Sequence, residues 1–231
     1  MRLAVCLAIL ALTAALAASA RAGGGLLVDP GDRLPRGCAD RIERRSWEPR
    51  PENKVPNHTI PSRKHLRAFH KASDLRHRYR INGRFRGRTD EILRWTACKW
   101  GYRANIARAV AVVESWWRQS TLGDSGHSIG LMQVKCMKRG DPHRPACPMA
   151  QRSTAFNTDY WGGFIRDCVD GKMKWLNDVE HGHGYRRGDL WGCVGVWYSG
   201  RWYTDPAKHY IAEVKRTKRR HVWKTKAFAG G

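Results

Sequence analysis

Residues 104–117, Ala-Asn-Ile-Ala-Arg-Ala-Val-Ala-Val-Val-Glu-Ser-Trp-Trp, are the stretch that decides the fold of this chain. Ala107, Val110 and Ala111 recur at helical spacing, and Glu114 follows on the same face. Because that face is otherwise apolar, the stretch predicts a helix packed inside the protein. Glu114 is the exception, since a carboxylate on a buried face is unfavourable unless it is paired, protonated or opens into a cleft.

Helical patterns surround this stretch on both sides. Thr89-Asp90-Glu91 offers an N-cap and first-turn carboxylates for a helix through Trp100, which Gly101 ends. Strand-like alternation is scarce, so we expect a mainly helical domain. Further helices are expected over residues 153–169, 189–198 and 206–221.

The ends of the chain differ from this helical region. Residues 1–22 have a basic start, a short apolar run and a small-x-small end, which predicts a cleaved signal peptide. Residues 23–85 are rich in Arg and Pro and predict an irregular basic arm. A basic amphipathic helix between residues 62 and 80 could end this arm, and a solvated flank is the alternative. We assign residues 86–225 to the main helical domain and 226–231 to a tail.

The cysteine content suits an exported protein. Without the expected signal segment, an even set of cysteines remains, and disulfides are the natural prediction for an oxidising compartment. Their pairing stays open, although the short loop between Cys136 and Cys147 favours a local bridge. The spacings that zinc sites require do not occur. The set comprises Cys38, Cys98, Cys136, Cys147, Cys168 and Cys193.

The charge of the chain predicts an anionic partner. The sequence has 43 Lys and Arg against 20 Asp and Glu, a net charge of +23. Outside the cytoplasm, such a surface favours peptidoglycan, anionic wall polymers or a membrane surface, contacted through the basic arm, and no specific nucleic acid is expected. The run 215–220 fits this interpretation.

Glu114 has the sequence context of a general acid. Burial beside Trp116 and Trp117, and a place at the negative end of a helix, both raise the pKa of its carboxyl group. A protonated carboxylic acid near neutral pH is what cleavage of a glycosidic bond requires. An ordinary buried salt bridge to an arginine is the alternative on the helix pattern alone.

The flanking motifs favour catalysis. Val112-Val113-Glu114-Ser115 and Gly130-Leu131-Met132-Gln133 resemble the Glu-Ser and Gly-Leu-Met-Gln motifs of the soluble-type lytic transglycosylases, in the lysozyme-like superfamily. Residues 157–163 are similar to that family's third motif, which begins with Asn, and residues 196–200 to its Ala-Tyr-Asn-Ala-Gly motif. The resemblance spans about residues 95–222.

The resemblance implies a lysozyme-like fold and a reaction. Glu114 would act as the single acid and base that cleaves the MurNAc–GlcNAc bond and leaves a 1,6-anhydro sugar, with neither cofactor nor metal. In residues 196–200 the register is open, so either Trp197 or Tyr198 would contact the sugar. The expected binding residues are Ser115, Ser128, Gly130, Met132, Gln133, Trp197 and Tyr198.

Two other functions remain open. A hydrolase would need a second carboxylate roughly 5–9.5 Å from Glu114, and Asp124 is the nearby candidate, although Asp beside Gly commonly builds turns. A non-catalytic protein that binds anionic wall polymer or membrane would explain the charge but not the motifs around Glu114.

Overall fold

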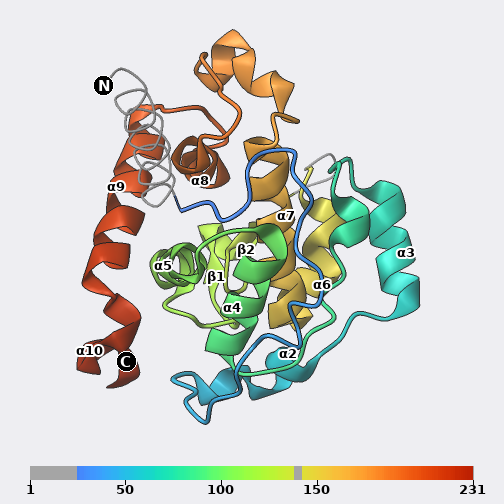
Figure 1. The fold of residues 1–231 in the computed structure, drawn as a ribbon, viewed down its shortest axis with the longest axis vertical. Helices are drawn as coiled ribbons and strands as arrows, with labels where there is room; N and C mark the ends of the chain where they lie inside the picture. The colour runs from blue at the N-terminus through green and yellow to red at the C-terminus, as the bar shows by residue number, and fades with distance from the viewer. Residues whose placement is uncertain (1–24, 138–141, 231) are drawn as a thin grey trace, which may run out of the picture.

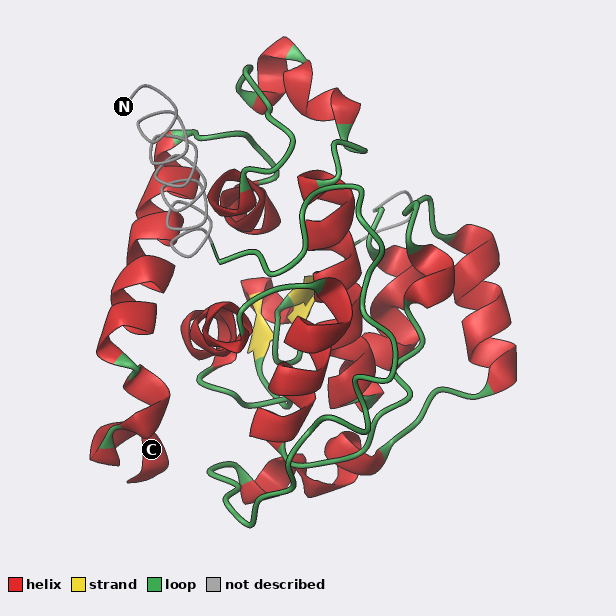
Figure 2. Ribbon diagram, viewed as in Figure 1, coloured by secondary structure: helices red, strands yellow, loops and turns green. Residues whose placement is uncertain are grey.

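The computed structural model describes residues 25–137 and 142–230, so the expected signal segment lies outside the described residues. The prediction of a mainly helical protein is confirmed (Figure 2). Short 3-10 turns connect many of the elements. The α-helices are α2 (Lys54–His58), α3 (Arg63–Ala72), α4 (Thr89–Trp100), α5 (Ala104–Ser115), α6 (Cys147–Arg152), α7 (Thr154–Val169), α8 (Leu190–Ser199), α9 (Asp205–Arg220) and α10 (Lys226–Gly230).

Helix α5 lies at the centre of the fold, between α4 and α9 (Figure 1). Helix α4 also packs on α7, while α8 packs on both α7 and α9. Ala107, Val110 and Ala111 are fully buried, so the apolar stripe of α5 faces the core as its spacing predicted. Large aromatic side chains fill the space around it, among them Trp100 and Trp161.

The expected boundary of α4 needs one correction. Thr89 is the first helical residue and Arg88 is the N-cap. The Arg88 backbone N–H donates to Glu91 Oε2 at 3.1 Å, so the Glu91 carboxylate supports the helix start that the sequence indicated. Gly101 ends α4 at φ 73°, a left-handed conformation that glycine adopts without strain.

A small antiparallel sheet follows α5. It consists of β1 (Leu122–Gly123), β2 (Ser128–Ile129) and β3 (Val134–Lys135), with Leu122 opposite Ile129 and Ile129 opposite Val134. Strands of two residues leave no alternation to detect, which explains why the sequence did not predict them.

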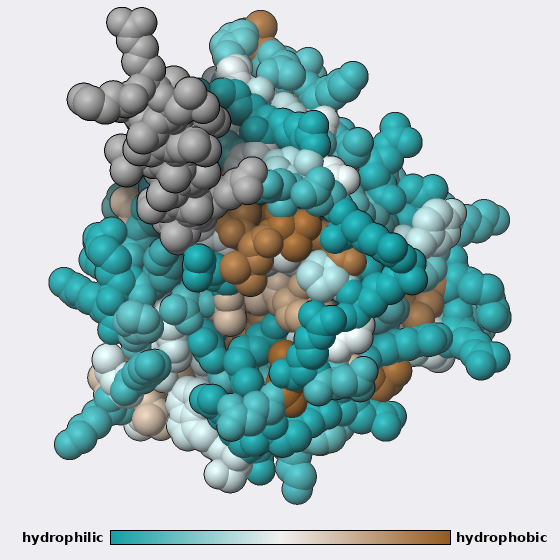
Figure 3. All heavy atoms as spheres, in the orientation of Figure 1, coloured by the Kyte–Doolittle hydropathy of each residue, from teal (hydrophilic) through white to brown (hydrophobic). Residues whose placement is uncertain are grey.

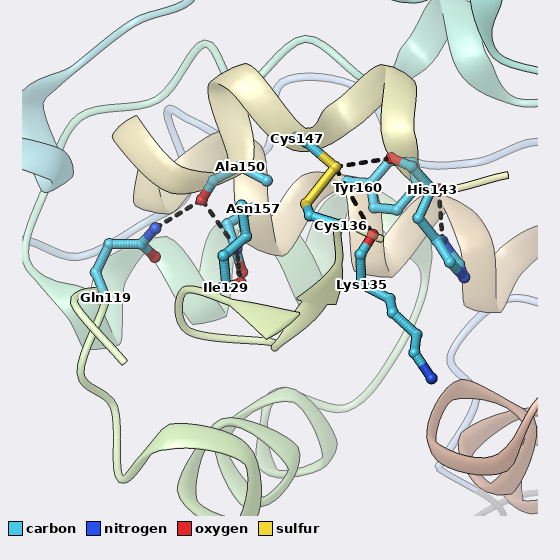
Figure 4. Close-up of a disulfide and its surroundings, with 9 residues drawn as sticks. All are labelled: Gln119, Ile129, Lys135, Cys136, His143, Cys147, Ala150, Asn157 and Tyr160. Carbon is cyan, nitrogen blue, oxygen red and sulfur yellow. Dashed lines mark hydrogen bonds between the residues drawn. A yellow bond between two sulfur atoms is a disulfide. The ribbon is translucent and has the colours of Figure 1, made fainter. Parts of the chain in front are cut away.

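All six described cysteines form disulfides, as the sequence predicted. Cys38 bonds to Cys98, Cys136 to Cys147, and Cys168 to Cys193. Figure 4 shows the local Cys136–Cys147 bridge beside α6. The Cys168–Cys193 bridge fastens α7 to α8, and the Cys38–Cys98 bridge fastens the N-terminal segment to α4.

The segment expected as an irregular arm packs on the helical body. Polar side chains fix it: Arg50, Asn53 and Asn57 are buried, and the Asn53 side chain donates to the Trp117 carbonyl oxygen at 2.7 Å. Leu66 and Phe69 of α3 are buried in the main core, so the expected amphipathic helix exists and is not a solvated flank. Few apolar residues mark this segment, which is why its sequence predicted no core.

The expected tail is also anchored. Lys226–Gly230 forms α10, and Phe228 is fully buried against Trp116 and Trp117. The Arg50 guanidinium donates to the Phe228 carbonyl oxygen at 2.8 Å, so the N-terminal segment contacts α10.

The outer surface is mainly polar in the view of Figure 3, where hydrophilic side chains cover most of the face. Within residues 25–137 and 142–230, no helix combines the length and the apolar character needed to cross a bilayer.

Candidate active site

A cleft of about 1200 Å³ opens at the C-terminal end of α5. Its walls come from the β1–β2 turn, the end of α8, and the segments that flank α7. Five residues singled out from the sequence share this cleft with Asp124. They are Glu114, Ser128, Gln133, Trp197 and Tyr198.

Glu114 lies in the last turn of α5, which ends where Trp116 adopts φ 55°. Tyr210 of α9 donates its hydroxyl hydrogen to Glu114 Oε1. In the described part of the chain, this hydroxyl is the one group that hydrogen-bonds the Glu114 side chain.

The pKa of Glu114 is raised from its ordinary value of 4.5 to about 8. Burial is the main cause; the Tyr210 hydrogen bond acts in the opposite direction, and the negative charges of Asp124 and Glu213 raise the pKa further. Burial also raises the pKa of the Tyr210 hydroxyl, so it stays a proton donor. At neutral pH the cleft therefore presents a carboxylic acid, as the position of Glu114 among apolar neighbours predicted.

Asp124 and Ser128 lie on opposite sides of the β1–β2 turn. The Ser128 hydroxyl donates to Asp124 Oδ2 at 2.6 Å, and the backbone of Asp124 accepts from the His127 N–H. Asp124 and Ser125 have φ values of 48° and 56°, a left-handed conformation that non-glycine residues rarely adopt. Asp124 is thus both a turn residue and a carboxylate on the cleft wall, so the two interpretations of its sequence context do not exclude each other.

Gln133 lines the cleft from the turn before β3. Its amide nitrogen donates to the carbonyl oxygens of Gly130 at 2.8 Å and Thr121 at 3.2 Å. Gln133 itself has φ 51°. The amide nitrogen of Gln133 therefore stabilises the turn, and its side-chain carbonyl oxygen is the atom left for other contacts.

Three of the expected binding residues lie behind the cleft wall instead of on it. Ser115 is buried and donates to the Leu131 carbonyl oxygen at 2.9 Å. Met132 is fully buried. Gly130 approaches protein and not ligand, because a Cβ on it would lie 2.3 Å from Asn157 Nδ2. All three serve to fix the Gly-Leu-Met-Gln turn against α5 and α7.

Trp197 and Tyr198 both line the cleft, but in different ways. The Trp197 indole nitrogen donates to the Met132 carbonyl oxygen at 2.9 Å, and its ring packs 5.1 Å from Phe164. Tyr198 is 57% exposed and stacks on Tyr210 with ring centroids 4.8 Å apart. Trp197 is therefore part of the wall, whereas Tyr198 presents an accessible aromatic edge.

Buried amides brace the site from behind. Asn157, which begins the third motif, donates to the Ile129 and Ala150 carbonyl oxygens (Figure 4). It also accepts from the Met132 N–H. Gln119 also donates to Ala150 O, at 2.7 Å, and accepts from the Leu131 N–H. This places Asn157 in the support of the turn and not on the cleft.

Tyr210 is the functional residue that sequence reasoning missed. It lies on the buried face of α9 with Ile211 and Val214, 96 positions after Glu114. A hydroxyl on an apolar stripe is the same kind of anomaly that singled out Glu114, and it could have been found by applying the same test to the predicted helix 206–221.

No group of three or more His, Cys, Asp or Glu side chains is arranged for a metal ion among the described residues. The His181 and His183 pair lies in the loop after α7, and His181 lines the cleft. No protein-family model, no curated protein and no solved structure matches this chain.

Proposed function

We propose that the chain is an exported lytic transglycosylase that cleaves the MurNAc–GlcNAc bond of peptidoglycan, with Glu114 as its single acid and base. One observation carries the proposal: a carboxyl group with a pKa of about 8 on the wall of a large cleft, hydrogen-bonded by one tyrosine. Such a group is protonated at neutral pH and can donate that proton as a glycosidic bond breaks.

The reaction needs no second carboxylate. Glu114 donates its proton to O4 of the leaving sugar as the C1–O4 bond breaks. The resulting carboxylate then accepts the proton of the C6 hydroxyl, whose oxygen forms the new C1–O6 bond. This step restores the acid and yields the 1,6-anhydro product. Tyr210 holds one carboxyl oxygen of Glu114, which leaves the other for both proton transfers.

The cleft offers contacts of the kind that sugars use. Tyr198 presents an exposed ring edge and a hydroxyl, and aromatic rings pack well on pyranose faces. The Gln133 carbonyl oxygen can accept from an acetamido or hydroxyl group. Export is supported by the three disulfides, because such bonds persist in oxidising compartments.

Digestion of purified sacculi tests the proposal. Wild type should release muropeptides that mass spectrometry identifies as 1,6-anhydro species. Glu114→Gln should keep its fold by circular dichroism and lose about 10²–10⁴-fold in release, the range for general acid–base catalysis. Release at wild-type rate by Glu114→Gln would sink the assignment. If both proteins bound sacculi alike and neither released product, a non-catalytic wall-binding protein would replace the enzyme.

Hydrolysis with Asp124 is the second candidate. It is favoured by one observation: Asp124 lines the same cleft and its charge acts on Glu114. For a transglycosylase, we expect Asp124→Asn to retain activity within about tenfold and to keep the anhydro product. Hydrolysis would be established instead if wild type released reducing-end products. Their release should then fall about 10³-fold in Asp124→Asn but not in the matched variant Ser128→Ala.

A further inference from the structure

A group of cationic side chains lies around one tryptophan where the start of α8 packs beside α9. The ammonium nitrogens of Lys215 and Lys218 lie 4.8 Å and 5.5 Å from the ring centroid of Trp191, at the start of α8. Arg219 of α9 and Arg103, the N-cap of α5, complete the group. We call these five residues the α9 cluster.

Among the described residues, the cations of the α9 cluster form no ion pair. In residues 25–137 and 142–230, ion pairs bind Lys99, Arg108 and Arg166 to aspartates, but none involves a cation of this cluster. Burial lowers the pKa of Lys218, and the neighbouring charges of Arg103, Lys215 and Arg219 lower it further. Like charges held together in this way repel one another until an anion lies between them.

The residues around the α9 cluster indicate which class of anion it would bind. Ile211 and Val214, the apolar residues of α9, are buried in the protein, so the helix has no free apolar face to insert into a bilayer. The Trp191 ring is covered by the two lysines, so it is not free to stack on a nucleic-acid base. What remains is an electrostatic surface with several hydrogen-bond donors.

We propose that the α9 cluster binds a phosphodiester polymer that is neither lipid nor nucleic acid, of the poly(polyol phosphate) type. Each phosphodiester carries a charge at every physiological pH and offers two oxygens to neighbouring donors. A flexible chain can place successive phosphates on the cations of α9 and on Arg103 without inserting apolar groups. This inference goes beyond the proposed function, because it concerns binding at a surface outside the cleft.

The cluster and the cleft meet through one helix. Tyr210 on the inner side of α9 contacts Glu114, while Lys215 and Arg219 lie one and two turns further along it. No residue of the α9 cluster lines the cleft, so polymer bound there would hold the enzyme at the wall while leaving the cleft open. Binding can therefore be measured separately from turnover.

Binding of purified poly(glycerol phosphate), followed by titration calorimetry at several salt concentrations, tests the proposal. The variant K215Q/K218Q/R219Q should bind about tenfold or more weakly, with a flatter salt dependence because fewer counterions are released. The matched variant K64Q/R67Q/K71Q removes the same charge from exposed positions on α3 and should lose less than about twofold. Thermal unfolding checks that both variants fold.

Several outcomes would overturn the proposal. Equal losses in the two variants would mean that total charge, and not this cluster, drives binding. A larger loss in the α3 variant would assign polymer binding to the N-terminal segment. Tighter binding to phosphatidylglycerol vesicles, or to single-stranded DNA at equal phosphate concentration, would assign the cluster to a membrane or to nucleic acid. None of these results depends on whether Glu114 cleaves glycan.

Discussion

Glu114 and Asp159 are two carboxyl groups withdrawn from solvent in one helical body, and the protein treats them in opposite ways. Asp159 of α7 is fully buried and accepts hydrogen bonds from the Asn82 and Gly83 N–H groups, the Trp100 indole and the Lys99 ammonium group, which lies 2.6 Å away. Glu114 has one hydroxyl and no cation. Asp159 is enclosed by protein and Glu114 lines the cleft, so the two carboxyl groups differ in their partners as well as in their access to solvent.

This contrast separates a structural carboxylate from the one that we propose to be catalytic. Four donors, one of them charged, bind the Asp159 carboxyl group and fasten the Asn82–Gly83 turn to α4 and α7. One neutral donor leaves Glu114 with a raised pKa and a proton available at neutral pH. A carboxyl group on an apolar helix face therefore suggests catalysis only where few hydrogen-bond donors and no cation bind it.

The largest effect on stability should come from breaking the ion pair between Asp159 and Lys99. Asp159→Asn leaves the Lys99 ammonium buried without its counter-charge, so we expect a loss of about 3–5 kcal/mol in the free energy of unfolding. Glu114→Gln, the matched amide substitution, should not lower it at pH 7, because a neutral acid is replaced by a neutral amide in the folded protein and the unfolded chain no longer gains free energy by ionising. Urea denaturation of both variants measures this; similar losses would erase the distinction.

A second effect concerns pH. Between the ordinary pKa of 4.5 and the folded value of about 8, folded Glu114 holds a proton that the unfolded chain releases. Its contribution to stability is therefore complete below pH 4.5 and is lost as pH rises towards 8. The stability of wild type relative to Glu114→Gln should fall over this window, and turnover should fall above about pH 8 as the acid ionises. A flat difference across pH 5–9 would contradict the raised pKa.

The smallest effect should come from removing the Tyr210 hydroxyl, which donates to Glu114. Because the Tyr210 hydrogen bond lowers the pKa of Glu114, Tyr210→Phe should move the alkaline limb of the kcat/KM profile upward. The turnover number should fall about tenfold as the carboxyl loses its fixed orientation, a magnitude typical of one ordinary hydrogen bond. Tyr198→Phe, which alters the ring stacked on Tyr210, is the control and should leave the limb in place.

The helical framework could be predicted because its signals are local. The apolar spacing of α5, the glycine after α4 and the serine before α7 all lie within a few residues of the boundary they mark. Ser153, for example, accepts from the Phe156 N–H as a conventional N-cap. Glu114 was also found locally, from its place on an apolar face.

The rest of the site depends on contacts between distant parts of the chain. A turn motif does not state which of its residues face outward, so Met132 and Gly130 were expected in the cleft, although their neighbours Asn157 and Gln119 hold them inside. Tyr210 reaches Glu114 only because α9 packs on α5. The N-terminal segment was misread for the same reason, since its buried groups are polar and their partners lie far along the sequence.

Arg50 joins the N-terminal segment and the C-terminal helix α10 at the end of α5. Its guanidinium donates to the Trp116 and Phe228 carbonyl oxygens, directly behind the end of α5. A protein shortened to residues 86–225 would lose both Arg50 and Phe228. The end of α5 that carries Glu114 would therefore be held less firmly. During synthesis, the hydrogen bond between Arg50 and Phe228 can form only once residue 228 has emerged. The helix end that carries Glu114 is therefore among the last parts of the molecule to be fixed in place.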